Sequence, residues 1–444
     1  MRYDGSYLFG GMNKRWVALP GVSAAWRINQ EEWFDAEWVN NLKLRAGAGK
    51  TASSAISAFQ WMNTMALNQN QVVIGGSSQT GITASTLGNP NLTWSQCMNY
   101  NVGVDATLWG GLLGIEADVF YKHEYDKLAS GTTGAYPPSM GGYYFSSANV
   151  NEVDYRGFDL TFSHYNKIGD FNYGMKFIWS YAYARWLHYA GDANDTQDYK
   201  RMTGKQVGSQ LSLIAEGLYQ SWEEIENSAI DSSRPPYPGY IKYKDVNGDG
   251  KITLAQDQGY FSRAATPTHT GSLNLFAEWK GFDIDLLFSY GAGNDVALMG
   301  LYVGVQGATD YIQSPTAFTR PFYQYGNSPR YLMEKSWVEG EDNSDAEFPR
   351  LEYTPSSMGN GYCSTFWNRD GKYLRLKTAQ VGYTFPKKMF AKIGIESLRI
   401  YAEGYNLFTW SELNKFNIDP EAPGVNNGYY PQQRTITMGL KVTF

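Results

Sequence analysis

The chain of 444 residues has a net charge of −6, and only 18% of its residues are charged while 16% are aromatic. The acidic balance argues against nucleic acid as a partner, because nucleic-acid binding needs a basic surface. Soluble domains usually have about a quarter of their residues charged. A chain this poor in charge and rich in rings is typical of a membrane barrel with aromatic girdles or of a sugar-binding protein with stacking faces.

Cysteine usage and hydropathy narrow the class further. Cys97 and Cys363 lie far apart in sequence, so they form no disulfide framework or metal motif, although a pairing between them stays open. No run of about 18 apolar residues is present, which excludes a transmembrane helix. Residues 1–5 lack the apolar core of a signal peptide, and from this we expect a fragment or a truncated product.

Long segments in which apolar and polar residues alternate dominate the chain. Alternation with period two places apolar side chains on one face of a strand and polar side chains on the other. In chain order, we predict strands at residues 17–28, 42–50, 102–108, 113–122, 158–163, 175–183, 273–279, 282–290, 373–385, 398–408 and 436–444. A few residues join neighbouring segments such as 102–108 and 113–122, which predicts antiparallel hairpins.

The lengths of the segments and of their connections favour a membrane barrel over a soluble sandwich. Strands of soluble sheets average about 5–6 residues, and several segments here are about twice as long, as tilted spanning strands must be. Residues 52–92, 188–266 and 292–371 lack the alternation and are rich in Gly, Ser, Asn, Pro and Tyr. Short turns at one end of the strands and long loops at the other are typical of an outer-membrane β-barrel.

The last eleven residues form the clearest strand. Ile436, Met438, Leu440, Val442 and Phe444 alternate with polar or small residues, and the last residue is aromatic. This pattern is typical of the closing strand of an outer-membrane barrel, although the last strand of a soluble sandwich also alternates. We expect this strand to be the recognition signal for membrane insertion.

Acidic residues occupy the polar face of several predicted strands. A barrel interior is polar, and carboxylates removed from water need a cationic or hydrogen-bonding partner. We expect six acids to pair with Lys or Arg across the barrel wall, or to contact a plug: Asp105, Glu116, Asp118, Asp159, Asp283 and Asp285.

The sharpest local motif has the spacing of a calcium-binding loop, with oxygen ligands at positions 1, 3, 5, 7 and 9 and glycine at position 6. The ligands that it offers are Asp245, Asn247, Asp249, the Lys251 carbonyl and Thr253. The bidentate carboxylate expected at position 12 is missing, because Gln256 stands there and Asp257 follows one residue late. A plain turn rich in Asp, Asn and Gly explains the same residues equally well.

Aromatic residues in the long loops are a second candidate site. Rings offer an oligosaccharide a flat apolar face, while nearby polar groups fix its hydroxyls. The candidates are Trp61, Tyr136, Tyr143, Tyr144, Phe145, Trp222, Tyr237, Tyr240, Tyr302, Tyr323 and Tyr325. Packing between loops, or a place in an interfacial girdle, explains any single ring more simply, and the sequence singles out no binding subset.

Little in the sequence points to an enzyme. The four histidines have neither metal-ligand spacing nor the Ser/Asp context of a catalytic triad: His123, His164, His188 and His269. Glu223 and Glu224 could be imagined as a glycosidase acid and base, but adjacent carboxylates on a loop are more often solvated. We therefore predict no catalytic residue and no required cofactor.

Short motifs follow one another in a fixed order through nearly the whole chain. They are Arg2-Tyr3-Asp4-Gly5-Ser6, Asn13-Lys14-Arg15-Trp16, Leu19-Pro20-Gly21-Val22-Ser23, Leu42-Lys43-Leu44-Arg45-Ala46, Asn89-Pro90-Asn91-Leu92-Thr93-Trp94, Arg156-Gly157-Phe158-Asp159-Leu160, residues 245–250, Tyr373-Leu374-Arg375-Leu376-Lys377, Gly382-Tyr383-Thr384-Phe385-Pro386 and Asn406-Leu407-Phe408. Each motif is weak alone. Their order and spacing resemble the SusC/RagA family of TonB-dependent outer-membrane transporters.

The resemblance implies an all-β fold, a 22-stranded transmembrane barrel with an internal plug. It also implies uptake of oligosaccharides or peptides with a SusD-like surface lipoprotein as lid, powered by the TonB complex. Residues 1–444 would be the C-terminal half to two-thirds of that barrel, surrounded by outer-membrane lipid and without plug or TonB-contacting region. We expect the chain alone to insert poorly, because its edge strands lack partners. The alternative is a non-transporting, surface glycan-binding or adhesive β protein.

Overall fold

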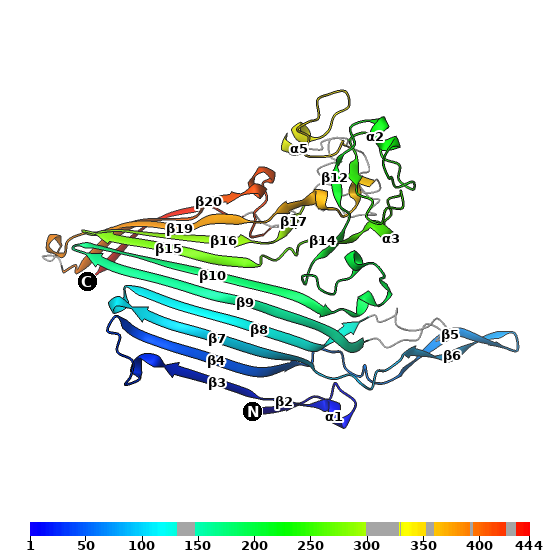
Figure 1. Cartoon of the computed structure of the whole chain (residues 1–444), viewed down its shortest axis with the longest axis horizontal. Coiled ribbons are helices and arrows are strands. Elements are labelled where there is room, and N and C mark those ends of the chain that lie inside the picture. The colour runs from blue at the N-terminus through cyan, green and yellow to red at the C-terminus, as the bar shows by residue number, and fades with distance from the viewer. Residues whose placement is uncertain (131–146, 299–327, 329, 352–358, 391–393, 423–431) are drawn as a thin grey trace. The chain divides into compact units, whose positions relative to one another are not determined.

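The computed structural model describes residues 1–130, 147–298, 328, 330–351, 359–390, 394–422 and 432–444. The chain divides into two compact units, Met1–Phe162 with Ser180–Val207, and Ser163–Trp179 with Gly208–Phe444. β-Strands dominate and the helices are short (Figure 1). Among the described residues, no helix has the length and apolar character needed to cross a membrane.

Eleven of the described strands pair in one sheet, in the order β21-β20-β19-β16-β15-β10-β9-β8-β7-β4-β3. Their bounds are β3 Gly21–Arg27, β4 Val39–Ser53, β7 Ser95–Leu108, β8 Leu113–Ser130, β9 Ser147–Ile168, β10 Phe171–His188, β15 His269–Trp279, β16 Phe282–Ala292, β19 Tyr373–Thr384, β20 Ser397–Ser411 and β21 Thr435–Thr443. The pairs β3–β4, β4–β7, β7–β8, β15–β16, β16–β19, β19–β20 and β20–β21 run antiparallel. The predicted antiparallel strands are confirmed, and several are longer than predicted. The exception is the single strand predicted at residues 17–28, which is divided into β2 (Trp16–Leu19), outside this sheet, and β3.

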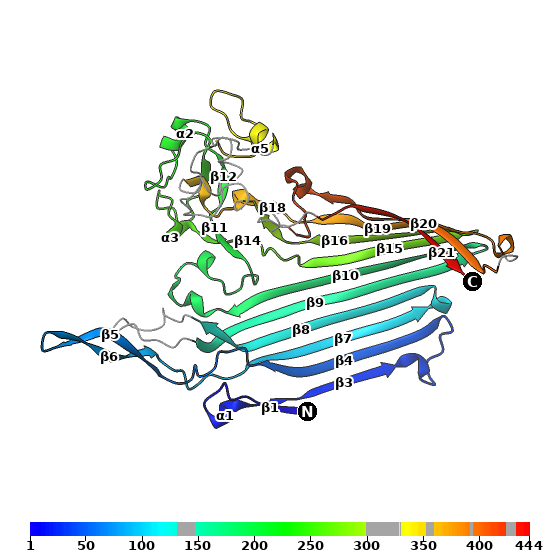
Figure 2. The same ribbon diagram turned by 180° about the vertical axis from the view of Figure 1, so that it is seen from behind.

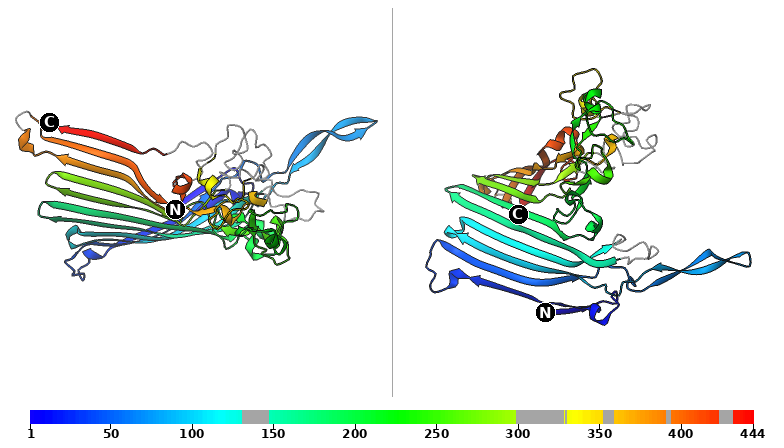
Figure 3. Two further views of the ribbon diagram at one scale, coloured as in Figure 1. Left: turned by 90° about the horizontal axis from the view of Figure 1, so that it is seen from above. Right: turned by 45° about the vertical axis from the view of Figure 1, so that its right-hand side comes forward.

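Unit 1 begins with a small hairpin, β1 (Arg2–Gly5) with β2 (Trp16–Leu19), which includes the short helix α1 (Met12–Arg15). A second hairpin, β5 (Thr64–Ile74) with β6 (Ser77–Thr86), extends from the ends of β4 and β7 (Figure 3). The expectation that residues 52–92 contain no strand was therefore wrong. Among the described strands these two pair only with each other, and their register shifts at Thr64/Met65 and Asn68/Val72.

Unit 2 shows why short turns join its long strands. The β15–β16 pair (Figure 2) has Trp279 directly opposite Phe282, so the loop is only Lys280 and Gly281. Both loop residues have positive φ angles, +48° and +92°. Two consecutive positive φ angles match the right-handed twist of the strands, and glycine adopts this conformation without strain.

Segments that the sequence marked as irregular loops fold together in unit 2. They contain β11 (Gln210–Ser212), β12 (Ala215–Leu218), α2 (Trp222–Glu226), β13 (Ile241–Tyr243), α3 (Leu254–Asp257), β14 (Gly259–Ser262), β17 (Asp295–Ala297), α5 (Arg330–Lys335) and β18 (Asn368–Asp370). Their buried side chains form one cluster together with residues that follow β20. The cluster is here called the loop core: Leu213, Ile241, Tyr243, Ile252, Val296, Leu298, Leu332, Phe348, Tyr362, Trp367, Leu413, Phe416 and Ile418. The irregular composition therefore hides a packed apolar core.

The exposure of side chains in the sheet is the reverse of that in a soluble protein. On β19, Leu374 and Val381 are exposed, while Arg375 is buried. On β7 and β8, Val102 and Val119 are exposed, 62% and 63%. Alternation puts these apolar side chains on one face and the charged side chains on the other. In β19 a register shift between Leu376 and Thr378 keeps Leu374 and Val381 on the same face. The apolar face is suited to lipid and the opposite face to a polar interior.

Candidate functional site

One arginine joins three strands on the polar face of unit 1. Arg45 on β4 donates from Nη2 to Asp105 Oδ1 on β7 and to Asp118 Oδ2 on β8, both at 2.7 Å. Lys43 lies 3.7 Å from Asp105 and adds a second cation. The two carboxylates balance the two cations. This part of the polar face of the sheet, here called the polar wall, is therefore charged but has little net charge.

A similar ion pair occurs on the polar face of unit 2. Arg399 on β20 donates from Nε to Asp283 Oδ1 on β16 at 3.0 Å, and from Nη2 to Gln380 Oε1 on β19 at 2.7 Å. The same guanidinium makes a second contact to Asp283 through Nη2. Asp283, Gln380 and Arg399 thus tie three consecutive strands of the sheet together.

The expected pairing of the wall acids with cations is confirmed for Asp105, Asp118 and Asp283. Two other acids have neutral partners instead. Asp159 accepts from the Ser180 hydroxyl at 2.6 Å, and Asp285 accepts from Asn274 Nδ2 at 2.9 Å. The sixth acid, Glu116, is exposed. The alternation of a strand reveals the face of each residue but not its cross-strand neighbour.

The candidate calcium loop is closed by hydrogen bonds to its own backbone. Asp245 accepts from the Gly248 and Gly250 amides, both at 2.7 Å, and Asp249 accepts from the Lys251 amide at 2.9 Å. Asn247 accepts from the Asp249 amide at 3.2 Å. These are the bonds of a turn rich in Asp and Asn.

A buried carboxylate accepts hydrogen bonds from backbone amides of this loop. Asp257, which follows position 12 of the motif, accepts from the amides of Val246 (2.9 Å) and Thr253 (2.8 Å). It is fully buried, so it holds both ends of the loop together. Among the described residues, no three His, Cys, Asp or Glu side chains converge as a metal-binding group. Calcium also binds carbonyl and amide oxygens. Calcium binding by this loop therefore stays a prediction.

Three of the predicted loop rings meet in unit 2. The ring centroids of Trp222 and Tyr237 are 5.4 Å apart, and those of Tyr237 and Tyr240 are 5.5 Å apart. Trp61 instead packs beside the buried cluster of unit 1. Seven predicted rings lie outside the described residues: Tyr136, Tyr143, Tyr144, Phe145, Tyr302, Tyr323 and Tyr325. Of the four predicted rings that the structure describes, three therefore lie together.

Buried tyrosines of the loops keep their protons and act as hydrogen-bond donors. Burial, with the nearby carboxylates of Glu224 and Glu216, raises the pKa of Tyr219 to about 12. Its hydroxyl donates to the Ala229 carbonyl at 3.2 Å. Burial and a hydrogen bond to Asp231 likewise raise the pKa of Tyr362. These groups hold the loops rather than offer acid or base chemistry.

Histidines and cysteines occupy structural positions. His123 stacks on Tyr125, and His269 stacks on Trp179, which donates from Nε1 to His269 Nδ1 at 3.3 Å. Cys97 and Cys363 are free thiols.

The sequence missed a buried charge cluster centred on Arg375. Its side chain is 2% exposed and donates from Nη2 to Asp419 (2.6 Å) and from Nη1 to Glu421 (2.9 Å) and Gln432 (2.6 Å). Glu421 also lies 3.4 Å from Lys377. The sequence feature that could have indicated the cluster is Asp419-Pro420-Glu421, which follows the predicted strand at residues 398–408. The cluster fastens the segment after β20 to the sheet wall.

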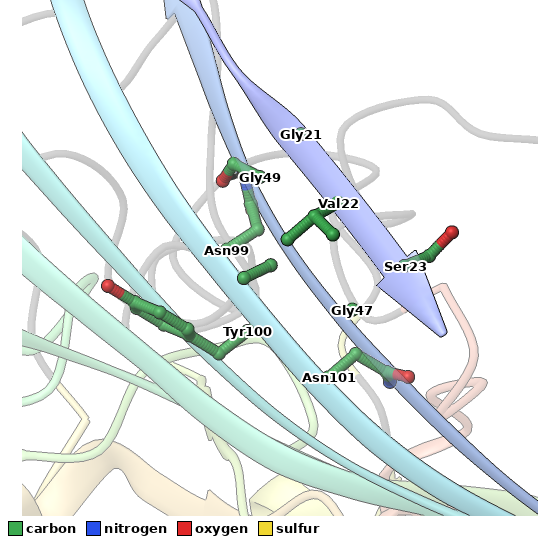
Figure 4. A pocket seen from close by; sticks show the side chains of 9 residues that line it. Gly21, Val22, Ser23, Gly47, Gly49, Asn99, Tyr100 and Asn101 are labelled. Atoms are coloured by element: carbon green, nitrogen blue, oxygen red, sulfur yellow. Dashed lines mark hydrogen bonds between the residues drawn. The ribbon is translucent and has the colours of Figure 1, made fainter. Parts of the chain in front are cut away.

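A shallow hollow of about 410 Å³ lies on β3, β4 and β7 (Figure 4). The hollow is lined by three glycines without side chains, Gly21, Gly47 and Gly49. The side chains of Val22 and Tyr100 project beside them (Figure 4). No carboxylate, cation or histidine lines this hollow. It provides shape without a group for acid–base chemistry.

The comparisons agree with the fold and the two-faced sheet. A family model described as "TonB dependent receptor-like, beta-barrel" matches residues 1–407. The chain belongs to this family. TonB-dependent receptors of this family are β-barrels of the outer membrane, and that is where the chain is located. The resemblance inferred from the motifs is thereby confirmed.

Individual relatives match the whole chain at low identity. TonB-dependent receptor P26 of Formosa agariphila is 26% identical, with 100% of this chain and 44% of that receptor covered. TonB-dependent receptor P3 of the same organism is 24% identical, with 43% of its length covered. This TonB-dependent receptor chain therefore spans less than half the length of the curated relatives that it matches.

Solved structures support the same fold. The RagAB peptide importer in its "open-open" state is 22% identical, with a TM-score of 0.71 over 99% of this chain and 44% of that one. The "closed-closed" state gives 0.69 over 100% of this chain. At this identity the likeness establishes the β-barrel fold alone.

Proposed function

We propose that this receptor chain is part of a transporter that takes oligosaccharides or peptides across the outer membrane. Uptake would depend on TonB, and a SusD-like surface lipoprotein would be the partner at the loop end. The observation that carries the proposal is the inverted exposure of the sheet: Leu374 is exposed, while Arg375, the next residue on the same strand and therefore on the opposite face, is buried. Such a wall is stable only with lipid on one side and a polar interior on the other.

The family and the relatives support the coarse function. The curated relatives are named TonB-dependent receptors, and the solved neighbours include a peptide importer. The substrate class stays open between oligosaccharides and peptides, since loop residues decide specificity and loops vary between relatives. The exposed rings of Trp222 and Tyr237 in unit 2 are compatible with either class.

An uptake experiment tests the proposal. An in-frame deletion of the gene, a tonB deletion and the parent strain would each be given fluorescent oligosaccharides or peptides as the labelled nutrient. We expect both deletions to abolish accumulation of the same nutrient, with restoration by the complete gene. The proposal would be wrong if the gene-deletion strain accumulated every nutrient normally. It would also be wrong if the gene deletion reduced accumulation but the tonB deletion did not.

The rival function, a non-transporting surface glycan-binding or adhesive protein, makes a different prediction about solubility. The exposed apolar side chains of β21, such as Met438 at 85%, would promote aggregation in water. We expect the protein to be monodisperse only in detergent or lipid. A monodisperse, folded protein in plain buffer would favour the rival.

A further inference from the structure

Tyr237 is exposed within a segment whose other residues are buried. Pro236, Pro238, Gly239 and Tyr240 are all buried, whereas 47% of Tyr237 is accessible. A large ring in such a segment would normally turn inward, because burial of an aromatic side chain is favourable by about 1.5–3 kcal/mol. The chain instead presents this ring to the outside.

Trp222 presents a second ring beside it. Trp222 is 53% exposed on α2, while Ile225 on the same helix is buried against Tyr219 and Tyr240. The planes of the Trp222 and Tyr237 rings are 72° apart. Two nearly perpendicular rings form a corner with two apolar faces, which we call the ring corner.

The backbone under the ring corner is held on several sides. The Gly239 amide donates to the Tyr219 carbonyl at 2.7 Å, and the Tyr219 amide donates to the Tyr240 carbonyl at 2.9 Å. The Arg350 amide donates to the Gly239 carbonyl at 3.0 Å. Gly239 has φ +88°, and the ring of Trp337 fills the place where a Cβ would lie. The ring corner is therefore ordered before a ligand arrives, which removes part of the entropic cost of binding.

The charges around the ring corner select among ligands. Glu226 lies four residues after Trp222 on α2, so both side chains share one face of the helix. Glu223 and Glu226 are both exposed. An exposed carboxylate on the Trp222 face, that of Glu226, repels a sulfated or uronic-acid chain but accepts hydrogen bonds from sugar hydroxyls.

We propose that Trp222 and Tyr237 form a stacking subsite for a neutral oligosaccharide of pyranose units. This deepens the proposed function by choosing its substrate class. The apolar C–H face of a pyranose matches an exposed ring, and the second ring of the corner contacts the edge of the same or the next sugar. The carboxylate of Glu226, on the same face of α2 as Trp222, accepts a hydrogen bond from a sugar hydroxyl.

Isothermal titration calorimetry of the receptor in detergent tests the subsite. Cellohexaose, maltohexaose and xylohexaose are the neutral probes, oligogalacturonate is the anionic probe, and a casein digest is the peptide probe. We expect at least one neutral probe to bind, and Trp222→Ala and Tyr237→Ala each to weaken it about tenfold. Tyr237→Phe keeps the ring and is expected to bind within about twofold of wild type.

Charge and location each have a control. Glu226→Gln is expected to retain neutral binding and to gain affinity for oligogalacturonate. Trp33→Ala removes a still more exposed ring of unit 1 and is expected to leave binding unchanged. Heat from peptides alone, wild-type affinity in both alanine variants, or no heat from any neutral probe would overturn the subsite. Binding needs no TonB, so these results are separate from the outcome of the uptake experiment.

Discussion

Arg45 and Asp118 form an ion pair across a strand to which neither belongs. The two residues lie on β4 and β8, and Gly103 on β7 is in register with both. Strands lie about 4.8 Å apart, so the guanidinium must reach over the middle strand. A Cβ at Gly103 would overlap the Asp118 carboxylate and lie 3.0 Å from Arg45 Nη2.

Unit 2 repeats this arrangement. A Cβ at Gly382 on β19 would lie 2.7 Å from both Arg399 Nε and Asp283 Oδ1. In each unit a glycine thus leaves the space for an ion pair that links strands on either side. The polar wall depends on these glycines as much as on its charged residues.

A side chain at Gly103 should therefore disrupt the wall. We expect Gly103→Ala to displace the Arg45–Asp118 pair and to lower the free energy of unfolding by about 1–3 kcal/mol. Thermal unfolding of the receptor in detergent, followed by heat-modifiable mobility, measures this. Gly47→Ala is the matched control, because the nearest atom to its Cβ would be 3.9 Å away. Equal stability of the two variants would contradict this role of Gly103.

The Asp283–Arg399 pair can be tested by a double-mutant cycle. Each single substitution, Asp283→Asn or Arg399→Gln, leaves the other residue charged without its partner. The double variant removes both charges. We expect a coupling energy of about 0.5–3 kcal/mol from unfolding of the four proteins. Glu116→Gln, at an exposed wall acid, should change stability by less than about 0.5 kcal/mol. Strict additivity of the two substitutions would show that the pair is not coupled.

Arg375→Met should release the segment after β20. Removal of the buried cation leaves Asp419 and Glu421 without their main partner, at a cost of about 3–5 kcal/mol. Hydrogen exchange should then become faster in residues 412–422 while the rest of β19 stays protected. Lys377→Met is the control, since this half-exposed cation should contribute less than about 1 kcal/mol. Unchanged exchange in Arg375→Met would rule out the fastening role.

Calcium binding by the loop from Asp245 to Thr253 stays a prediction with a direct test. We expect calorimetric heat on calcium titration of wild type and none in Asp249→Ala, because the latter removes a carboxylate at position 5. Asp342→Ala removes an exposed carboxylate elsewhere and should bind as wild type does. If wild type gives no heat, the loop is a plain hydrogen-bonded turn.

Much of the sheet could be predicted because its pattern is local. Alternation in residues 282–290 and 373–385 depends only on the two faces of one strand, and β16 and β19 lie where the pattern placed them. The strand ends were less predictable. β9, for example, begins at Ser147 and continues to Ile168, since beyond the lipid-facing part no apolar face is needed.

The candidate site depended on contacts that no local pattern encodes. The sequence named Trp222, Tyr237 and Tyr240 among eleven rings, but only the fold brought these three together. Leu213 and Trp367 share the loop core although more than 150 residues separate them. In the long, Gly-rich and Ser-rich segments the apolar residues are too sparse to form a periodic face. The sequence of these segments therefore looked irregular.

By itself, the sequence determined an antiparallel, two-faced sheet for the outer membrane, because strand periodicity, charge and length are properties of each segment alone. Only the tertiary structure decided which charges pair, as with Arg375 and Glu421, and which rings stay exposed. Those outcomes depend on register and on the packing of distant loops. A shift of one residue in register would move every side chain of a strand to the other face.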